Sequence, residues 1–469
     1  MKKQLLLTLI PLFALTSCGG TPTESSNPES TPTTSETSSE TTSETTSETT
    51  SEEAPEEGSA VVNMYGKDKT YKVTVNYDKD YFNTPSNEFS KDLAMFAYGL
   101  NLATSKKEEA DAFLDGLNFK DKVLAPLYTE GESEDSIGYI LGHLNMGDDE
   151  LIVLGIRGLL YKTEWISNFK VGKEGNHAGF EAASQIVIAA LDEYITAHNL
   201  GNAKLLMSGY SRGGAVANLT AQNLMSREAD KKLLKDENLY VYTFEAPRGV
   251  ANPIKYENVF NIINEADLIT NILPEEYDLF RCGIDINIYN EDIDNIVQGF
   301  DPTIALPAFT SSSGSFDTET DFPKYLINNL LSTEVPSRKI STREEYVDNI
   351  EETILYVARM IFSLKSSTLD AIMEYVSTQE MSDLYPLISD GQNLHDFIKP
   401  YLDEDGYEYE DDKLLEECNI LVEFLTQGPG AFVLVFYAFY KDNFSRMINL
   451  HYPEIVYALL NAYEVPVEE

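Results

Sequence analysis

Ser211 lies in a pattern that can turn a serine hydroxyl into a nucleophile. Gly209, Ser211 and Gly213 form a G-x-S-x-G motif in which the serine occupies a sharp strand-to-helix turn that only small neighbours permit. The apolar run 205–208 predicts the strand before this turn, and apolar residues at near-helical spacing predict the helix after it. We therefore expect the hydroxyl to be exposed at a helix N-terminus, where free amides can stabilise an oxyanion.

A serine hydroxyl reacts only when a base takes its proton and a carboxylate orients that base. Asp267 is the candidate acid, because it directly follows the predicted strand 259–264. The candidate bases are the five histidines His143, His177, His198, His395 and His451. The first three precede the serine and violate the order Ser, acid, His of α/β-hydrolases. Chain order alone leaves His395 and His451 nearly tied.

The elements that must position these residues alternate between strands and helices. Alternating or continuous apolar residues predict strands at 70–77, 136–144, 150–156, 205–208, 239–244 and 259–264. Apolar stripes at helical spacing predict helices around 89–100 and 180–194. This alternation predicts an α/β fold with a mostly parallel sheet flanked by helices. Beyond Pro274, residues 275–340 are rich in loops, with one strand candidate at 282–288, and residues 341–469 have an almost wholly helical pattern.

The N-terminus predicts export and anchoring. Residues 1–17 place two lysines ahead of an apolar run too short to span a bilayer, which is typical of a signal peptide. Their ending at Cys18 resembles a bacterial lipobox, which implies cleavage before Cys18 and lipidation of its sulfur. Residues 19–58 are mostly Ser, Thr, Pro and Glu, and residues 33–52 repeat with a four-residue period, which predicts an extended tether from 18 to 58. The folded domain is then 59–469, held outside the cytoplasm on a bacterial membrane.

The composition limits the partners of the chain. A formal net charge of −44 argues against binding to nucleic acid or electrostatic docking on anionic lipid. With Cys18 lipidated, Cys282 and Cys418 remain, and their spacing leaves open whether they form a disulfide.

Five motifs together resemble the fungal-type (class 3) lipase family. They are Arg157-Gly158, HAGF (177–180), SGYSRGGAVANLTA (208–221), YTFEAPRGVAN (242–252) and NIINEADLITNILP (261–274). The resemblance implies an α/β-hydrolase fold, with Ser211 as nucleophile and Asp267 as acid. In that family the histidine precedes a short aromatic-rich helix near the C-terminus, which favours His451, in HYPEIVYALL, over His395.

Two features depart from the family pattern. The residue after Arg157-Gly158 is usually Thr, Ser or Asp in the family, whereas here it is Leu159, which offers an amide but no hydroxyl. The oxyanion hole would then consist of the amides of Leu159 and Arg212. The chain from Asp267 to His451 is also much longer than the family's ending. Residues 275–445 therefore form either a helical cap over the site or helices that only enlarge the core or bind a partner.

These residues predict a lipid-anchored serine hydrolase that cleaves carboxylic esters, with acylglycerols or related lipids as the expected substrates. The chemistry implied needs no metal and no organic cofactor. An acyltransferase or a deacylase of envelope glycans is an alternative, because the triad fixes acyl transfer but not the acceptor. A non-catalytic surface-binding lipoprotein is the alternative from another class, motivated by Leu159 and the long insertion.

Overall fold

The computed structural model describes residues 57–124, 136–147, 149–158, 162–333, 337–379 and 381–466. The predicted signal peptide, Cys18, nearly all of the tether and Leu159 lie outside these ranges. What the sequence indicates for them stays a prediction.

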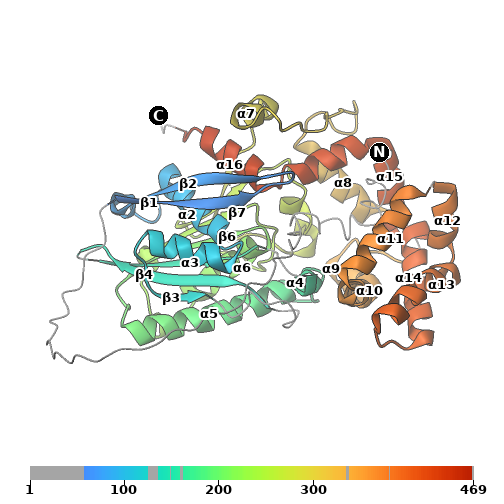
Figure 1. Ribbon diagram of the computed structural model, residues 1–469, viewed down its shortest axis with the longest axis horizontal. Coiled ribbons are helices and arrows are strands. Elements are labelled where there is room, and N and C mark those ends of the chain that lie inside the picture. Colours follow the sequence, from blue (N-terminus) through green and yellow to red (C-terminus); the bar gives the residue numbers. More distant parts are fainter. Residues whose placement is uncertain are drawn as a thin grey trace, which may run out of the picture.

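The described residues form a seven-stranded sheet that is parallel over most of its width (Figure 1). Its strands, in spatial order, are β3 (Lys120–Leu124), β4 (Tyr139–Asn145), β5 (Glu150–Ile156), β6 (Lys204–Tyr210), β7 (Leu239–Phe244), β8 (Val259–Ile263) and β9 (Ile284–Asn287). Strands β5 to β9 are parallel, and β3 and β4 pair antiparallel at one edge. The α/β fold expected from the sequence is confirmed.

Helices cover both faces of this sheet, as its apolar strands require. In β6, Leu205 and Met207 belong to one buried cluster, whereas Leu206 between them belongs to the other. On the first face lie α5 (Ala178–His198) and α6 (Arg212–Met225), and on the second lie α2 (Lys91–Ala103) and α3 (Lys107–Gly116). The C-terminal ends of the parallel strands thus lie between two layers of helices.

A separate hairpin of β1 (Glu57–Tyr65) and β2 (Thr70–Asp78) packs against α2 and α3. The predicted strand 70–77 is therefore confirmed, and its partner β1 was not expected. Residues on the inner face of the hairpin, among them Val62 and Val75, extend the second buried cluster.

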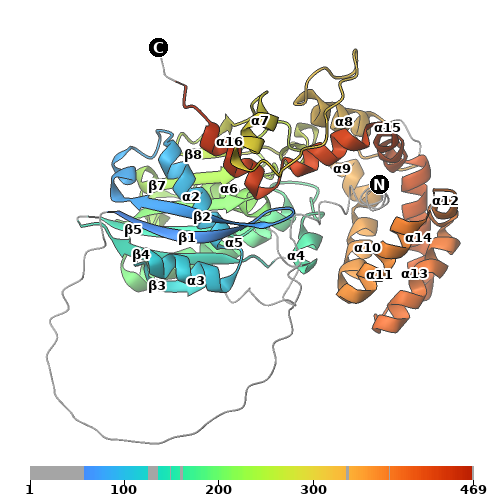
Figure 2. The same cartoon turned by 45° about the horizontal axis from the view of Figure 1, so that its top comes forward.

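The C-terminal half is mostly helical. Its helices are α7 (Ile293–Phe300), α8 (Asp321–Ser332), α9 (Arg343–Tyr346), α10 (Glu352–Ser363), α11 (Ser366–Thr378), α12 (Met381–Ser389), α13 (Gly391–Asp405), α14 (Asp411–Gln427), α15 (Pro429–Asn449) and α16 (Pro453–Ala462). Figures 1 and 2 both place α10 to α14 beside the sheet, whereas α16 returns to it. Strand β9, inside the range 275–445, belongs to the sheet, so the helical insertion begins after it.

Two further observations concern anchoring and cross-linking. Among the described residues, no single helix is long and apolar enough to cross a bilayer; only α14 with residues 429–437, bent by 51°, reaches that length and apolarity. Cys282 and Cys418 are both buried free thiols in different apolar clusters.

Candidate active site

Ser211 occupies the turn between β6 and α6. Its backbone angles, φ 54° and ψ −125°, are outside the helical and extended regions, and its side chain makes no capping hydrogen bond. A Cβ on Gly209 would lie 2.1 Å from the carbonyl oxygen of Gly213, and one on Gly213 would lie 2.5 Å from that of Arg157. Both positions therefore require glycine, as the nucleophile-elbow motif predicts.

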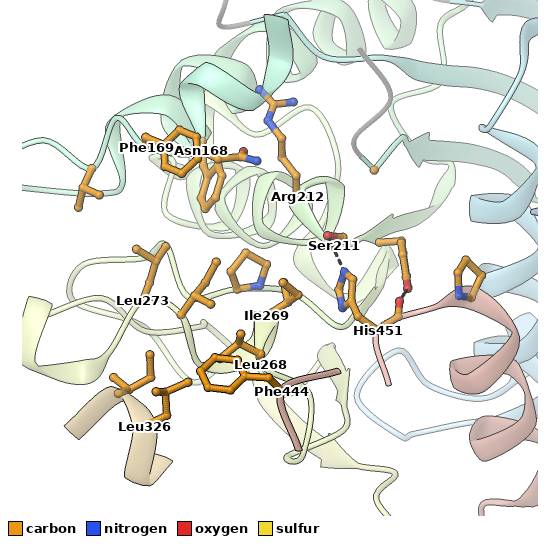
Figure 3. A pocket seen from close by; sticks show the side chains of 18 of the residues that line it. Asn168, Phe169, Ser211, Arg212, Leu268, Ile269, Leu273, Leu326, Phe444 and His451 are labelled. Carbon is orange, nitrogen blue, oxygen red and sulfur yellow. Dashed lines mark hydrogen bonds between the residues drawn. The ribbon is translucent and has the colours of Figure 1, made fainter. Parts of the chain in front are cut away.

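The structure brings Ser211, His451 and Asp267 together, as expected. The Nε2 atom of His451 lies 2.9 Å from the Oγ atom of Ser211 (Figure 3), and its Nδ1 atom lies 2.5 Å from the Oδ2 atom of Asp267. His451 is 2% exposed and Asp267 is fully buried. The backbone amide of Ile269 donates to Oδ1 of Asp267 at 2.9 Å. The imidazole is thus fixed between the hydroxyl and a carboxylate that is itself held in place.

His395, the other candidate base, lies elsewhere. It sits in α13, where its ring nitrogens are 2.9 Å from a carboxylate oxygen of Asp396 and 3.2 Å from one of Asp411. Its environment is an ion-pair cluster within the helical insertion.

Two tyrosines that the sequence analysis did not single out position the His451 loop. The hydroxyl of Tyr210 donates to the backbone carbonyl of His451, and the two rings stack with centroids 5.2 Å apart. The hydroxyl of Tyr98, from α2, donates to the carbonyl of Pro453 at 2.9 Å. Tyr210 precedes the serine directly, so the elbow itself anchors the loop that delivers the base.

Burial sets the protonation state of the base. Removal from water disfavours the imidazolium, and this lowers the pKa of His451 from its ordinary value of 6.5 to about 4. His451 is therefore neutral at pH 7 and can accept the proton of Ser211.

Glu245 is a second buried carboxyl beside this site. It follows β7, has φ 47° and is fully buried. The amide of Asn264 donates to Oε2 at 3.0 Å, and the Glu245 carboxyl also shares a side-chain hydrogen bond with Asp267. A carboxylate oxygen of Glu245 lies within 4.8 Å of Asp267 and of His451. Burial, followed by the charge of Asp267, raises the pKa of Glu245 well above its ordinary range.

Burial raises the pKa of Asp267 as well, to about 8, but the Ile269 amide and a hydrogen bond from Glu245 oppose this rise, so Glu245 keeps the proton and Asp267 is the carboxyl that ionises. Two carboxylates so close together in a buried site cannot both ionise. Asp267 is the better anion because the Ile269 amide and His451 both contact it, whereas Glu245 receives only one amide. Sequence reasoning missed Glu245, and the available signal was a carboxyl at the end of the strand next to the elbow, in YTFEAP.

The expected oxyanion hole is described only in part. Arg212 is the first residue of α6, so its amide lies at the free N-terminus of that helix beside Ser211. Its side chain is buried, extends away from Ser211 and donates from Nη2 to the Ser167 hydroxyl at 2.9 Å (Figure 3). Leu159 lies outside the described residues.

A cavity of about 800 Å³ opens beside Ser211 and His451. Leu268, Ile269 and Leu273, which follow Asp267 in the chain, form one apolar wall (Figure 3). The insertion supplies more of the lining, including Leu326 and Leu330 from α8, Ile354 from α10, Phe424 from α14, and Val433 and Phe444 from α15. The helices that lie between Asp267 and His451 in the sequence thus line the cavity on which Ser211 and His451 open.

Comparison with known proteins agrees with this arrangement. Residues 153–277 match the sequence model of the family described as lipase (class 3). Among curated protein sequences, none matches the chain.

Solved structures of lipases overlap with part of the chain. A triacylglyceride lipase from Rhizomucor miehei is 16% identical, with 44% of this chain and 83% of that chain covered and a TM-score of 0.31. A lipase from Rhizopus microsporus var. chinensis is 18% identical (43% and 75% covered, TM-score 0.31), and the Lip2 lipase from Yarrowia lipolytica is 14% identical (49% and 83% covered, TM-score 0.32).

The segment matched by the family model runs from β5 past Asp267 and includes the whole elbow. The resemblance read from the motifs is therefore confirmed: residues 153–277 match class 3 lipases, which are carboxylic ester hydrolases, and they lie on an α/β-hydrolase sheet.

Proposed function

We propose that this protein is an exported serine hydrolase that cleaves carboxylic esters with apolar acyl chains, through an acyl-enzyme on Ser211. One observation carries the proposal: the hydrogen-bonded series Ser211, His451 and Asp267 opens directly on a largely apolar cavity. The geometry matches what nucleophilic catalysis by serine needs, a base within hydrogen-bond reach of the hydroxyl and an acid behind the base.

The steps follow from the protonation states. Neutral His451 takes the proton of Ser211 at Nε2 as Oγ attacks the ester carbonyl, and Asp267 stabilises the imidazolium that forms. His451 then gives this proton to the leaving alcohol, and the acyl group remains on Oγ. A water molecule, deprotonated by His451, then attacks the acyl carbonyl; the bond from the acyl carbon to Oγ breaks, His451 returns the proton to Oγ of Ser211, and the acid is released.

The oxyanion would be stabilised by backbone amides alone. The amide of Arg212 lies at the N-terminus of α6, and we assign the second donor to the amide of Leu159. Because leucine has no hydroxyl, the hole lacks the additional side-chain donor that the family resemblance implies.

The cavity points to a lipid substrate. Its volume, about 800 Å³, is within the range of small-molecule sites, and the aliphatic and aromatic side chains around it suit an acyl chain. Acylglycerols or related lipids are the proposed substrate class. Export and anchoring through a lipidated Cys18 are proposed from the N-terminal sequence, and such an anchor would keep the enzyme close to a membrane.

Replacement of Ser211 by alanine tests the nucleophile. We expect Ser211→Ala to lower kcat for p-nitrophenyl ester hydrolysis by a factor on the order of 10⁶, because no other group can form the acyl-enzyme. Labelling by a fluorophosphonate probe should be lost, with the thermal unfolding transition unchanged. The matched control, Ser226→Ala at the end of α6, should retain labelling. Full activity in Ser211→Ala, or no labelling of the wild type, would contradict the proposal.

Substitutions of Glu245 test its protonation. A glutamine can accept from the Asn264 amide and donate to Asp267, so Glu245→Gln should retain kcat/KM within about threefold if Glu245 is a neutral acid. Glu245→Ala leaves buried groups unpaired at a cost of about 1–3 kcal/mol, or roughly 5- to 150-fold in kcat/KM. Equal losses in the two variants, with both folded by circular dichroism, would show that the site needs a charged Glu245 instead.

Filling the cavity from α8 tests the acyl site. Leu330 lines the cavity, so Leu330→Trp should shorten it and lower the ratio of kcat/KM for a C12 ester over a C4 ester by about tenfold or more. Asn328→Trp is the control, because Asn328 is exposed on the same helix. An unchanged ratio in Leu330→Trp would exclude this cavity as the acyl site.

A further inference from the structure

A second cluster of histidine and carboxylate side chains lies at the opposite end of the sheet from Ser211. Asp121 is on β3, His143 on β4, and His198 is the last residue of α5. His143 pairs with Ile152 on β5, and Ile152 pairs with Leu205 near the start of β6. Ser211 is six residues further along, roughly 20 Å at 3.3 Å per residue. The cluster is therefore independent of the ester hydrolase site.

The distances within the cluster fit a metal ion better than direct hydrogen bonds. Nε2 of His143 is 3.5 Å and Nδ1 of His198 is 3.6 Å from the same oxygen, Oδ2 of Asp121. Hydrogen bonds between nitrogen and oxygen are usually about 2.7–3.2 Å long. Ligands held tetrahedrally at about 2.0–2.2 Å from Zn²⁺ are separated by roughly 3.3–3.6 Å. All three ligand atoms lie within 4.8 Å of one another, so one ion can reach them together.

Nδ1 of His143 has a hydrogen-bonding neighbour, as the second ring nitrogen of metal-bound histidines usually does. The hydroxyl of Tyr194 donates to the carbonyl of Lys120 at 3.3 Å and lies 2.8 Å from Nδ1 of His143. In the tautomer with the proton on Nδ1, the hydroxyl accepts from Nδ1–H while it donates to that carbonyl. The other ring nitrogen, Nε2, then carries a free lone pair towards Asp121.

The backbone holds the carboxylate in this position. Asp121 has φ 48° and lies at an irregularity in the pairing of β3 with β4, between Lys120 and Val123. A bulge of this kind redirects the side chain of an edge strand. The Asp121 side chain is 52% exposed and that of His198 is 31% exposed, so a water molecule can complete the coordination.

The ligand set selects among metals. Two imidazoles and one carboxylate suit Zn²⁺ or a similar transition-metal ion, whereas Ca²⁺ and Mg²⁺ prefer oxygen ligands alone.

We propose that Asp121, His143 and His198 bind one divalent transition-metal ion of the zinc type. The ion would join the edge strand β3 and the end of α5 to β4, three segments distant in the sequence. Its role would be structural, and it takes no part in the ester chemistry.

Zinc binding to the untagged full-length chain tests the proposal. After treatment with a chelator and dialysis, the wild type should bind one zinc equivalent at this site by isothermal titration calorimetry, and its Tm should rise with zinc concentration above Kd. His143→Ala and His198→Ala should lose this equivalent. Tyr194→Phe, which removes only the hydroxyl, should weaken binding by about 10- to 100-fold. Co²⁺ in place of zinc should give the visible absorption of a site with nitrogen and oxygen ligands.

The control is His395→Ala, which removes another histidine that contacts carboxylates and should bind zinc as the wild type does. Should His143→Ala fail to fold, Asp121→Asn and Tyr194→Phe decide the matter, because each keeps the shape of its side chain. A wild type that binds no zinc overturns the proposal. Zinc that binds His143→Ala and His198→Ala as tightly as it binds the wild type also overturns the proposal. Zinc bound at His451 instead would be one such case, and it would be recognised because it blocks fluorophosphonate labelling of Ser211.

Discussion

The contact between His451 and Asp267 is the interaction on which the site depends. The two residues are 184 positions apart, yet Nδ1 and Oδ2 are 2.5 Å from each other in an environment that excludes water. Burial favours a neutral imidazole and makes every unpaired charge expensive. The site therefore carries a single negative charge, on Asp267, and the carboxyl of Glu245 beside it is neutral. The serine hydroxyl then faces a base that is oriented and unprotonated.

The long helical insertion leads the chain from the sheet to the position of His451. The chain leaves the sheet after β9, forms α7 to α15 and returns at α16. On the way it supplies the apolar residues of α8, α10, α14 and α15 that line the cavity beside Ser211. At the return point, Tyr210 and Tyr98 hold the loop through the carbonyls of His451 and Pro453. The segment that shapes the cavity is therefore the same segment that carries the base.

Local patterns in the sequence predicted the local parts of this arrangement. The elbow could be predicted because its constraint, the absence of a Cβ at Gly209 and Gly213, acts within a few residues. The parallel strands could be predicted because a sheet buried on both faces leaves continuous apolar runs. The match of residues 153–277 to class 3 lipases agrees with the motifs in that segment.

Contacts between distant segments could not be predicted in the same way. Chain order did not separate His451 from His395, because the fold of the insertion decides which histidine reaches Ser211, and only the family resemblance favoured His451. Glu245 was missed because its burial beside Asp267 is a tertiary property. Strand β1 was missed because it directly follows the Ser-, Thr- and Glu-rich segment, and its pairing with β2 is a tertiary property. The role of Leu159 stays a prediction.

The pH dependence of fluorophosphonate labelling of Ser211 tests whether a neutral His451 is the base. The labelling rate reports the neutral fraction of the base in the free enzyme. A buried histidine with a lowered pKa is protonated only in acid. We therefore expect the labelling rate to stay constant down to below pH 6.5 and to fall towards pH 4. A rate that already halves at pH 7 or above would contradict this expectation.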